Sequence, residues 1–252
     1  MLIKDITMGN LKLSLLFTAF LFTFNINYAQ MGFEKDVFET DNDKLELWFI
    51  GHGTLMFKYG DMVIHIDPVS READYSGMPD ADIILITHEH GDHLDPGAIK
   101  QILKDETLII CNKASSTDLD DCRIMANGDK LEVMGISIEA VPAYNIKHER
   151  APGKPFHPRG NGNGYILDIG GKTIYVAGDT ENIPEMKNFK DIDIAFLPMN
   201  LPYTMSPEMA ADAARMINPG ILYPYHFGST DTGVIIELLK GTGIDVRIRK
   251  LQ

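Results

Sequence analysis

Apolar and polar residues follow one another along the chain in short runs that predict many strands and few helices. Residues 82–86 and 193–197 are nearly continuous apolar runs, a pattern typical of strands covered on both faces. Further strands are predicted at residues 45–50, 54–58, 61–66, 107–111, 165–169, 172–177, 221–225 and 246–248, with two more within 131–141. Helices are predicted at residues 96–103, capped by Asp95, from the Ser206 cap to about residue 216, and at 234–239.

Two parts of the chain follow the same plan. Asp67 ends a hairpin strand and is followed by the apolar strand at 82–86, and Asp179 ends a second hairpin strand and is followed by the strand at 193–197. In each half, an acidic residue and the end of the next strand therefore reach the same edge. Two such βαβ-like halves that face each other, with helices outside, predict an α/β protein with a four-layer αββα sandwich. We expect a site where the strand ends of the two halves meet.

The main chemical signal follows the first apolar strand, where residues 87–93 read Thr-His-Glu-His-Gly-Asp-His. Alternate residues of an extended backbone point to the same side, so His88 and His90 can reach one ion. The glycine then lets the chain turn, and Asp92 and His93 are delivered from that turn. A mixed nitrogen and oxygen donor set suits Zn, Fe or Mn. A solvated histidine-rich loop is the alternative, but four ligand-type residues directly after an apolar strand favour a metal site.

The pattern His88-x-His90-x-Asp92-His93 resembles the signature of the metallo-β-lactamase fold hydrolases. The segment around Asp179 resembles the one that supplies a metal-bridging carboxylate in that family, and His226 resembles its last histidine ligand. The resemblance covers the chain from about Leu45 to the C-terminus and implies one hydrolase domain at residues 37–252.

Shorter stretches refine this resemblance. Gly51-His52-Gly53-Thr54 and Ile66-Asp67-Pro68 are similar to segments of the small lactonase-like and phosphodiesterase-like branch. The stretch at residues 141–145, with residues 156–158 and 203–205, resembles an uncharacterised subgroup of that branch. The branch implies hydrolysis of an ester, a lactone or a phosphodiester.

One ligand position departs from the family pattern. The family usually supplies a histidine directly after the strand that ends here at Ala143, where this chain has Asn145. Asn145, His148 and His157 are the three candidates for the missing ligand. Asparagine is a weak ligand for Zn or Mn, and His148 lies among charged residues and is expected to be solvated. We therefore predict His157, which two nearby prolines anchor.

The resemblance implies a site for two divalent metal ions, most simply Zn, with Mn or Fe as alternatives. The first ion would be bound by His88, His90 and His157, the second by Asp92, His93 and His226, and Asp179 would bridge the two. Such a pair lowers the pKa of a shared water and provides hydroxide at neutral pH. Asp92 is the expected catalytic residue, since its carboxylate could transfer the proton.

Neighbouring residues are expected to support this site. His52 is predicted to contact a ligand, and Asp67 is predicted to orient a ligand histidine from behind. His65 alternates with isoleucines and is expected to pack within its strand. Tyr203 and Thr204 are predicted to line the substrate pocket, or else to form an ordinary turn before the next helix.

The first residues of the chain predict export. Lys4 and Lys12 precede an apolar run at residues 13–24, and small and polar residues follow it, which is typical of a signal peptide at residues 1–29, cleaved after Ala29. An uncleaved anchor is the alternative, but the run is shorter than the ~20 residues that span a bilayer. We expect a periplasmic or secreted protein without stable membrane insertion after cleavage.

The net charge and the cysteine content limit the expected binding partners and the expected covalent links. The formal net charge of −13 argues against a nucleic-acid binder, which needs a basic face, and a small-molecule substrate is expected instead. Export permits a disulfide between Cys111 and Cys122, but two separate buried thiols fit the sequence at least as well.

Two other functions compete with hydrolysis. A non-catalytic metal-binding or sensing protein would be expected to have lost ligands, yet six of the seven expected positions are filled without ambiguity. A redox protein with a di-iron centre would need a flavin domain or further carboxylate ligands, and the sequence predicts neither.

Overall fold

Two seven-stranded β-sheets form the centre of the domain, which the computed structural model describes over residues 32–251. The predicted signal peptide, residues 1–29, lies outside the described residues. None of the helices within the described residues has the length and apolar character needed to cross a membrane.

The first sheet contains the strands of the N-terminal half in chain order. Its strands are β1 (Glu34–Glu39), β2 (Lys44–Gly51), β3 (Thr54–Tyr59), β4 (Met62–Ile66), β5 (Ile83–Leu85), β6 (Leu108–Cys111) and β7 (Arg123–Ile124). The first four pair antiparallel, and β4 to β7 pair parallel. The carboxyl ends of β4 and β5 therefore open toward the same edge of the sheet.

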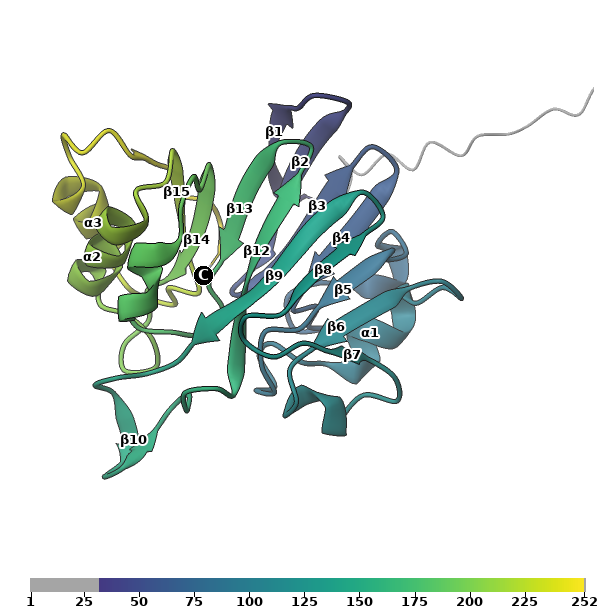
Figure 1. Ribbon diagram of the computed structural model, residues 1–252, viewed down its shortest axis with the longest axis horizontal. Coiled ribbons are helices and arrows are strands. Elements are labelled where there is room, and N and C mark those ends of the chain that lie inside the picture. Colours follow the sequence, from purple (N-terminus) through teal and green to yellow (C-terminus); the bar gives the residue numbers. More distant parts are fainter. Residues whose placement is uncertain (1–31, 252) are drawn as a thin grey trace, which may run out of the picture. The chain divides into compact units, whose positions relative to one another are not determined.

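The second sheet repeats this plan in the order β16-β15-β14-β13-β12-β9-β8. Its strands are β8 (Lys130–Val133), β9 (Ile136–Ala143), β12 (Gly162–Ile169), β13 (Lys172–Val176), β14 (Ile194–Pro198), β15 (Ile221–Tyr225) and β16 (Asp245–Val246). Strands β8, β9, β12 and β13 pair antiparallel, and β13 to β16 pair parallel. A separate short hairpin of β10 (Glu149–Ala151) and β11 (Lys154–Pro155) projects from the domain (Figure 1).

Helices cover the outer faces of the sheets. Figure 1 shows α1 (Pro96–Ile102) beside the first sheet, and α2 (Pro207–Ile217) and α3 (Gly233–Leu238) beside the second. Short 3-10 helices, η2 (Tyr75–Gly77), η3 (Ser115–Thr117) and η4 (Pro184–Asn188), lie in the connections. The predicted four-layer αββα sandwich is confirmed.

Buried aromatic rings join the inner faces of the two sheets. Phe49 of β2 and Tyr223 of β15 lie with their ring centroids 5.0 Å apart, and Phe57 of β3 lies 5.8 Å from Phe196 of β14. All four side chains are almost fully buried. Aromatic contacts of this kind add to the burial of apolar area, so they hold the two halves in one core.

The predicted repeat of the two halves is confirmed by the strand pairing. β4 runs parallel to β5, with Ile66 opposite Leu85, and β13 runs parallel to β14, with Val176 opposite Phe196. The residues that follow these strands consequently reach one end of the sandwich from both sheets.

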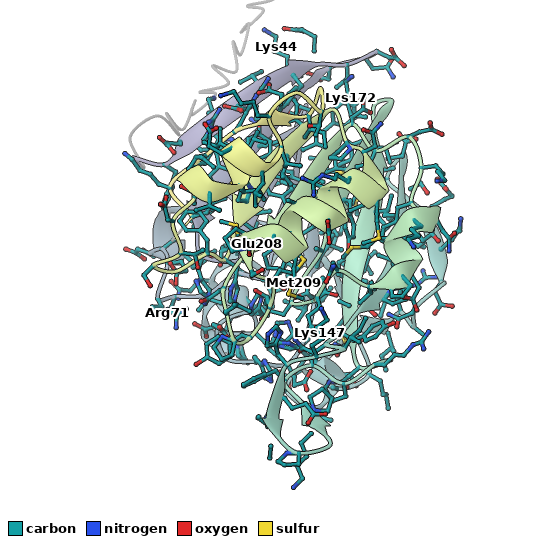
Figure 2. All side chains as sticks on the ribbon, turned by 90° about the vertical axis from the view of Figure 1, so that its left-hand side faces the viewer. Lys44, Arg71, Lys147, Lys172, Glu208 and Met209 are labelled. Carbon is teal, nitrogen blue, oxygen red and sulfur yellow. A yellow bond between two sulfur atoms is a disulfide. The ribbon has the colours of Figure 1, made fainter. Side chains whose placement is uncertain are left out.

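The predicted helix caps are also present. Asp95 accepts hydrogen bonds from the backbone N–H groups of Gly97 and Ala98 at 2.8 and 3.2 Å, and the Ser206 hydroxyl accepts one from Met209 at 3.2 Å. Each bond satisfies a donor of the first helical turn that would otherwise have no partner. Figure 2 shows Met209 at the start of α2.

Several features differ from the sequence prediction or settle what it left open. β1 begins before residue 37, which was the domain start expected from the sequence. The strand is fixed to the other sheet through Asp36, which accepts hydrogen bonds from Tyr223 and Arg249. The strands β7, β10 and β11, each of two or three residues, were not predicted. Cys111 and Cys122 form a disulfide rather than two separate thiols.

Candidate metal centre

The seven predicted donor residues come together at one end of the sandwich. Four of them lie in the loop after β5, one follows β11, one follows β13 and one follows β15. They fall into overlapping groups whose candidate ligand atoms lie within 4.8 Å of one another. The donors brought together are His88, His90, Asp92, His93, His157, Asp179 and His226.

Unusual backbone conformations direct the strand ends toward this point. His52, Asp67 and His226 each have φ near +50°, the left-handed region that residues with a Cβ rarely adopt. Gly178, before Asp179, has φ of +64°, and a Cβ there would lie 2.8 Å from the Asn163 carbonyl oxygen, so only glycine fits. Such strained positions often cluster at functional sites.

The first donor set consists of His88, His90 and His157. Nε2 of His88 lies 3.1 Å from Nδ1 of His90, and Nε2 of His157 lies 3.2 Å from the same atom. Three ring nitrogens that converge in this way match the nitrogen ligands that Zn²⁺ accepts.

The second donor set consists of His52, Asp92, His93 and His226. Oδ2 of Asp92 lies 3.4 Å from Nε2 of His52 and 3.6 Å from Nε2 of His226. His52 was expected only to contact a ligand, but its ring nitrogen lies among the candidate donors themselves.

Asp179 lies between the two sets. Its Oδ2 is 3.2 Å from Nε2 of His157 and 3.8 Å from Nε2 of His88, whereas its Oδ1 is 3.4 Å from Nε2 of both His93 and His226. Burial alone would raise the pKa of Asp179, but the charges of His226 and His93 hold it well below its usual value. The carboxylate is therefore an anion that both sets share.

Unpartnered buried atoms test whether these residues fit a metal. Oδ1 of Asp179 and Nε2 of both His93 and His226 are buried and have no hydrogen-bond partner among the described residues. A buried polar atom without a partner costs about 1–3 kcal/mol, so such atoms need an explanation. They converge on one point beside an anionic carboxylate, which fits a bound cation.

Asp67 supports the second set from behind, as predicted. Its Oδ2 accepts a hydrogen bond from Nδ1 of His93 at 2.7 Å and from the Thr87 hydroxyl at 2.6 Å, and its Oδ1 accepts one from the Thr87 backbone N–H at 2.8 Å. With the proton on Nδ1, Nε2 of His93 is left as a metal donor. Burial lowers the pKa of His93, but Asp179 and Asp67 raise it well above its usual value, which reflects a negative potential that favours a cation here.

Asn145 supports the first set instead of joining it. Its Oδ1 accepts hydrogen bonds from the backbone N–H and from Nδ1 of His157, both at 2.7 Å. This contact turns Nε2 of His157 toward His90 and Asp179. Of the three candidates for the missing ligand, the structure therefore brings His157 to the site and gives Asn145 the task of orienting it.

Glu181 holds this support in position and was not identified from the sequence. The carboxylate is fully buried and accepts hydrogen bonds from three consecutive backbone N–H groups, those of residues 146 to 148, and from Nδ2 of Asn145. It also lies 2.7 Å from Nδ1 of His148. The expectation that His148 is solvated holds only in part, since its side chain is 28% exposed but its Nδ1 pairs with a buried carboxylate.

The structure also gives the positions of His65, Tyr203 and Thr204. His65 is fully buried and its Nε2 bonds the Pro79 carbonyl at 3.0 Å, so it packs within its strand as predicted. Tyr203 lines the cavity, as predicted. Thr204 does not, because its buried side chain bonds the backbone of Asn200 and closes the turn.

A cavity of about 700 Å³ opens over the donor sets. Residues of the donor sets and their neighbours line it: His52, His90, Asp92, His157, Asp179 and His226, together with Arg71, Glu72, Arg150, Phe156, Asn200 and Tyr203. A small organic molecule fits a cavity of this size.

An αββα sandwich with histidine and aspartate donors at its strand ends defines a class of metal-binding proteins, and comparison with known proteins identifies the family. Residues 46–226 match the model of the β-lactamase superfamily domain, and the chain belongs to this superfamily, with the metallo-β-lactamase fold. The chain is 33% identical over 201 residues to a UPF0173 metal-dependent hydrolase from Pyrococcus abyssi. The alignment covers 72% of this chain and 84% of that relative.

Solved structures agree with this fold. A protein from Parabacteroides distasonis, assigned as a metal-dependent hydrolase, is similar with a TM-score of 0.84 and 54% identity, over 87% of this chain and 100% of that chain. The diiron β-hydroxylase CmlA from Streptomyces venezuelae shares the fold with a TM-score of 0.65 at 14% identity, over 84% of this chain and 53% of that chain.

Proposed function

We propose that the chain is a metal-dependent hydrolase that uses two divalent ions, with zinc as the first choice, on an ester, a lactone or a phosphodiester. The observation that carries the proposal is the buried Asp179 carboxylate, with one oxygen beside each donor set. The names of the Pyrococcus and Parabacteroides relatives support the same activity.

The residues present fit such ions, and each would have a definable task. The first donor set and Asp179 would hold one ion, and the second donor set and Asp179 would hold the other. Bound there, divalent ions would lower the pKa of a water molecule and supply hydroxide at neutral pH. Asp67 and Asn145 keep the ligand nitrogens of His93 and His157 free of protons by accepting the hydrogen of the opposite ring nitrogen.

Asp92 is the residue we propose for proton transfer. Its carboxylate is part-exposed to the cavity, and its Oδ2 lies within 3.6 Å of Nε2 of both His52 and His226. Burial raises its pKa, but its contacts with His226 and His52 lower it below the usual value. An anionic carboxylate that lines the cavity can accept a proton from water and pass it to a leaving group.

A substrate panel tests the proposal. Metal-loaded protein is assayed with nitrophenyl esters, lactones and bis(4-nitrophenyl) phosphate, beside a His88→Ala variant. We expect hydrolysis of at least one substrate, and at least about a hundredfold loss in the variant because the first donor set loses a ligand. Unchanged hydrolysis in the variant would contradict the assignment. Bound metal without turnover on the whole panel would favour a non-catalytic metal-binding protein.

We also propose that the protein is exported, to the periplasm or the medium. The Cys111–Cys122 disulfide supports this, since disulfides persist in oxidising compartments. The expected intact mass of the exported protein is that of a chain beginning at Gln30. A full-length mass in the cytoplasmic fraction would contradict export.

A further inference from the structure

Arg150, in the short hairpin of β10 and β11, presents a cation at the side of the cavity. Its Nη2 donates a hydrogen bond to the Phe156 carbonyl at 2.8 Å and lies 3.5 Å from Nε2 of His90. Within residues 32–251, no carboxylate forms an ion pair with this guanidinium. An arginine fixed by a neutral carbonyl keeps its full charge and several free donors for a ligand.

The other arginine of the cavity differs. Nε of Arg71 donates to the Glu72 carboxylate at 2.8 Å, and both residues line the cavity. This pair neutralises its own charge, so of the two arginines that line the cavity, Arg150 is the one without a carboxylate partner among the described residues. Figure 2 shows Arg71 and Lys147 at the end of the domain from which the hairpin projects.

Metal binding through Nδ1 of His90 would add a second donor beside Arg150. Nδ1 of His90 faces Nε2 of both His88 and His157, so this is the atom available to a metal. With a metal on Nδ1, Nε2 would carry the proton, and the N–H groups of His90 and Arg150 would be two donors 3.5 Å apart with no acceptor between them. An oxygen anion that accepts from both would satisfy the pair.

An aromatic wall stands next to these donors. The rings of Phe156 and Tyr203 meet edge to face with their centroids 5.1 Å apart, and the Arg150 guanidinium lies 5.9 Å from the Phe156 centroid. Tyr203 is 47% exposed, so its ring is available to a ligand that enters the cavity. Aromatic faces favour flat or apolar groups.

We propose that Arg150 and Nε2 of His90, with Phe156 and Tyr203, form a subsite for an anionic oxygen group of the substrate, a carboxylate or a phosphate next to an apolar group. The subsite rests on the proposed function, because the His90 tautomer follows from metal binding through Nδ1. It selects an anion inside a protein of net charge −13, so the selection is local and not a property of the whole surface.

A pair of matched esters tests the subsite. Mono-4-nitrophenyl glutarate carries a carboxylate, and 4-nitrophenyl butyrate is its neutral counterpart. We expect the ratio of their kcat/KM values to fall about tenfold to hundredfold in Arg150→Gln, mainly through the KM of the glutarate, because a charge-assisted hydrogen bond is lost. The ratio in Arg150→Lys should lie between those of the wild type and Arg150→Gln, since lysine keeps the charge but lacks the planar guanidinium.

Lys154→Gln is the control, because it removes the same charge from the same hairpin at an exposed residue that does not line the cavity. The ratio should stay at its wild-type value, with bound metal unchanged in all variants. The subsite would be overturned if the ratio in Arg150→Gln stayed within twofold of the wild-type ratio. It would also be overturned if Lys154→Gln lowered the ratio as much as Arg150→Gln does.

Calorimetric titration of metal-loaded protein separates this inference from the hydrolase proposal. Phenylphosphonate and phenylacetate are the probes, and the one with the larger loss of affinity in Arg150→Gln identifies the preferred anion. A tenfold weaker Kd in the variant without turnover of any ester would support the subsite and contradict the hydrolase. Ester turnover together with unchanged Kd values for both probes in Arg150→Gln would support the hydrolase and contradict the subsite.

Discussion

Asp179→Asn is expected to lower hydrolysis by the metal-loaded protein about a thousandfold, which corresponds to about 4 kcal/mol of transition-state stabilisation. The reason is that one buried carboxylate serves both donor sets, with Oδ2 beside His157 and Oδ1 beside His93 and His226. An amide has no negative charge and only one acceptor oxygen, so it cannot serve both. Kinetics together with elemental analysis measure the loss of turnover and of bound metal.

The matched control is Asp168→Asn, an exposed aspartate of β12 in the same hairpin that leads to Asp179. It should keep wild-type turnover and metal content. Wild-type turnover in Asp179→Asn would mean that the carboxylate is not shared by the catalytic ions.

Asn145→Leu is expected to weaken metal binding by the first donor set about tenfold to hundredfold. Leucine has a similar size but cannot accept the hydrogen bonds from the backbone and from Nδ1 of His157. The imidazole then loses both its fixed tautomer and its orientation. Competition with a chromophoric chelator measures the affinity.

High metal concentration separates this positioning role from a general loss of structure. Saturating zinc should restore most of the turnover of Asn145→Leu, whereas a misfolded protein would not recover. Asn188→Leu, at an exposed residue that ends η4, should bind metal as the wild type does. An unchanged affinity in Asn145→Leu would show that His157 needs no such support, or that it is not a ligand.

The sequence predicted the strands that carry a clear hydrophobic pattern. The hairpin of β3 and β4 and the apolar strand β5 were located to within about two residues, a common accuracy for element boundaries. β1 escaped because its six residues, Glu-Lys-Asp-Val-Phe-Glu, lie at a sheet edge and are half exposed, so burial leaves little trace in its composition. Strands as short as β10 and β11 have too few residues to show a period.

The donors of the metal centre were predictable for a different reason. His88, His90, Asp92 and His93 are adjacent in the sequence, and the repeat of two halves indicated that Asp179 would reach the same edge. Glu181 gave no signal, because its role depends on backbone N–H groups more than thirty positions earlier in the chain. The sequence left open whether Thr204 lines the pocket or forms a turn, since only the turn geometry decides whether its hydroxyl faces the cavity or the Asn200 backbone.

The role of His52 was predictable only in part. The turn at Gly51-His52-Gly53 marked it as a residue near the site, yet only the fold shows that its Nε2 reaches Asp92 at 3.4 Å. At the neighbouring Gly53, a Cβ would lie 2.7 Å from Cε1 of His93. The glycine thus lets the turn between β2 and β3 pack directly against the ring of His93.

We expect hydrolysis to depend on ions that the two donor sets bind. The most direct measurement is the turnover of chelator-stripped protein during titration with zinc, using the best substrate of the panel. We predict no turnover without metal and a rise that ends near two equivalents per chain. Full turnover of the stripped protein, or binding of zinc without any gain in turnover, would contradict the claim.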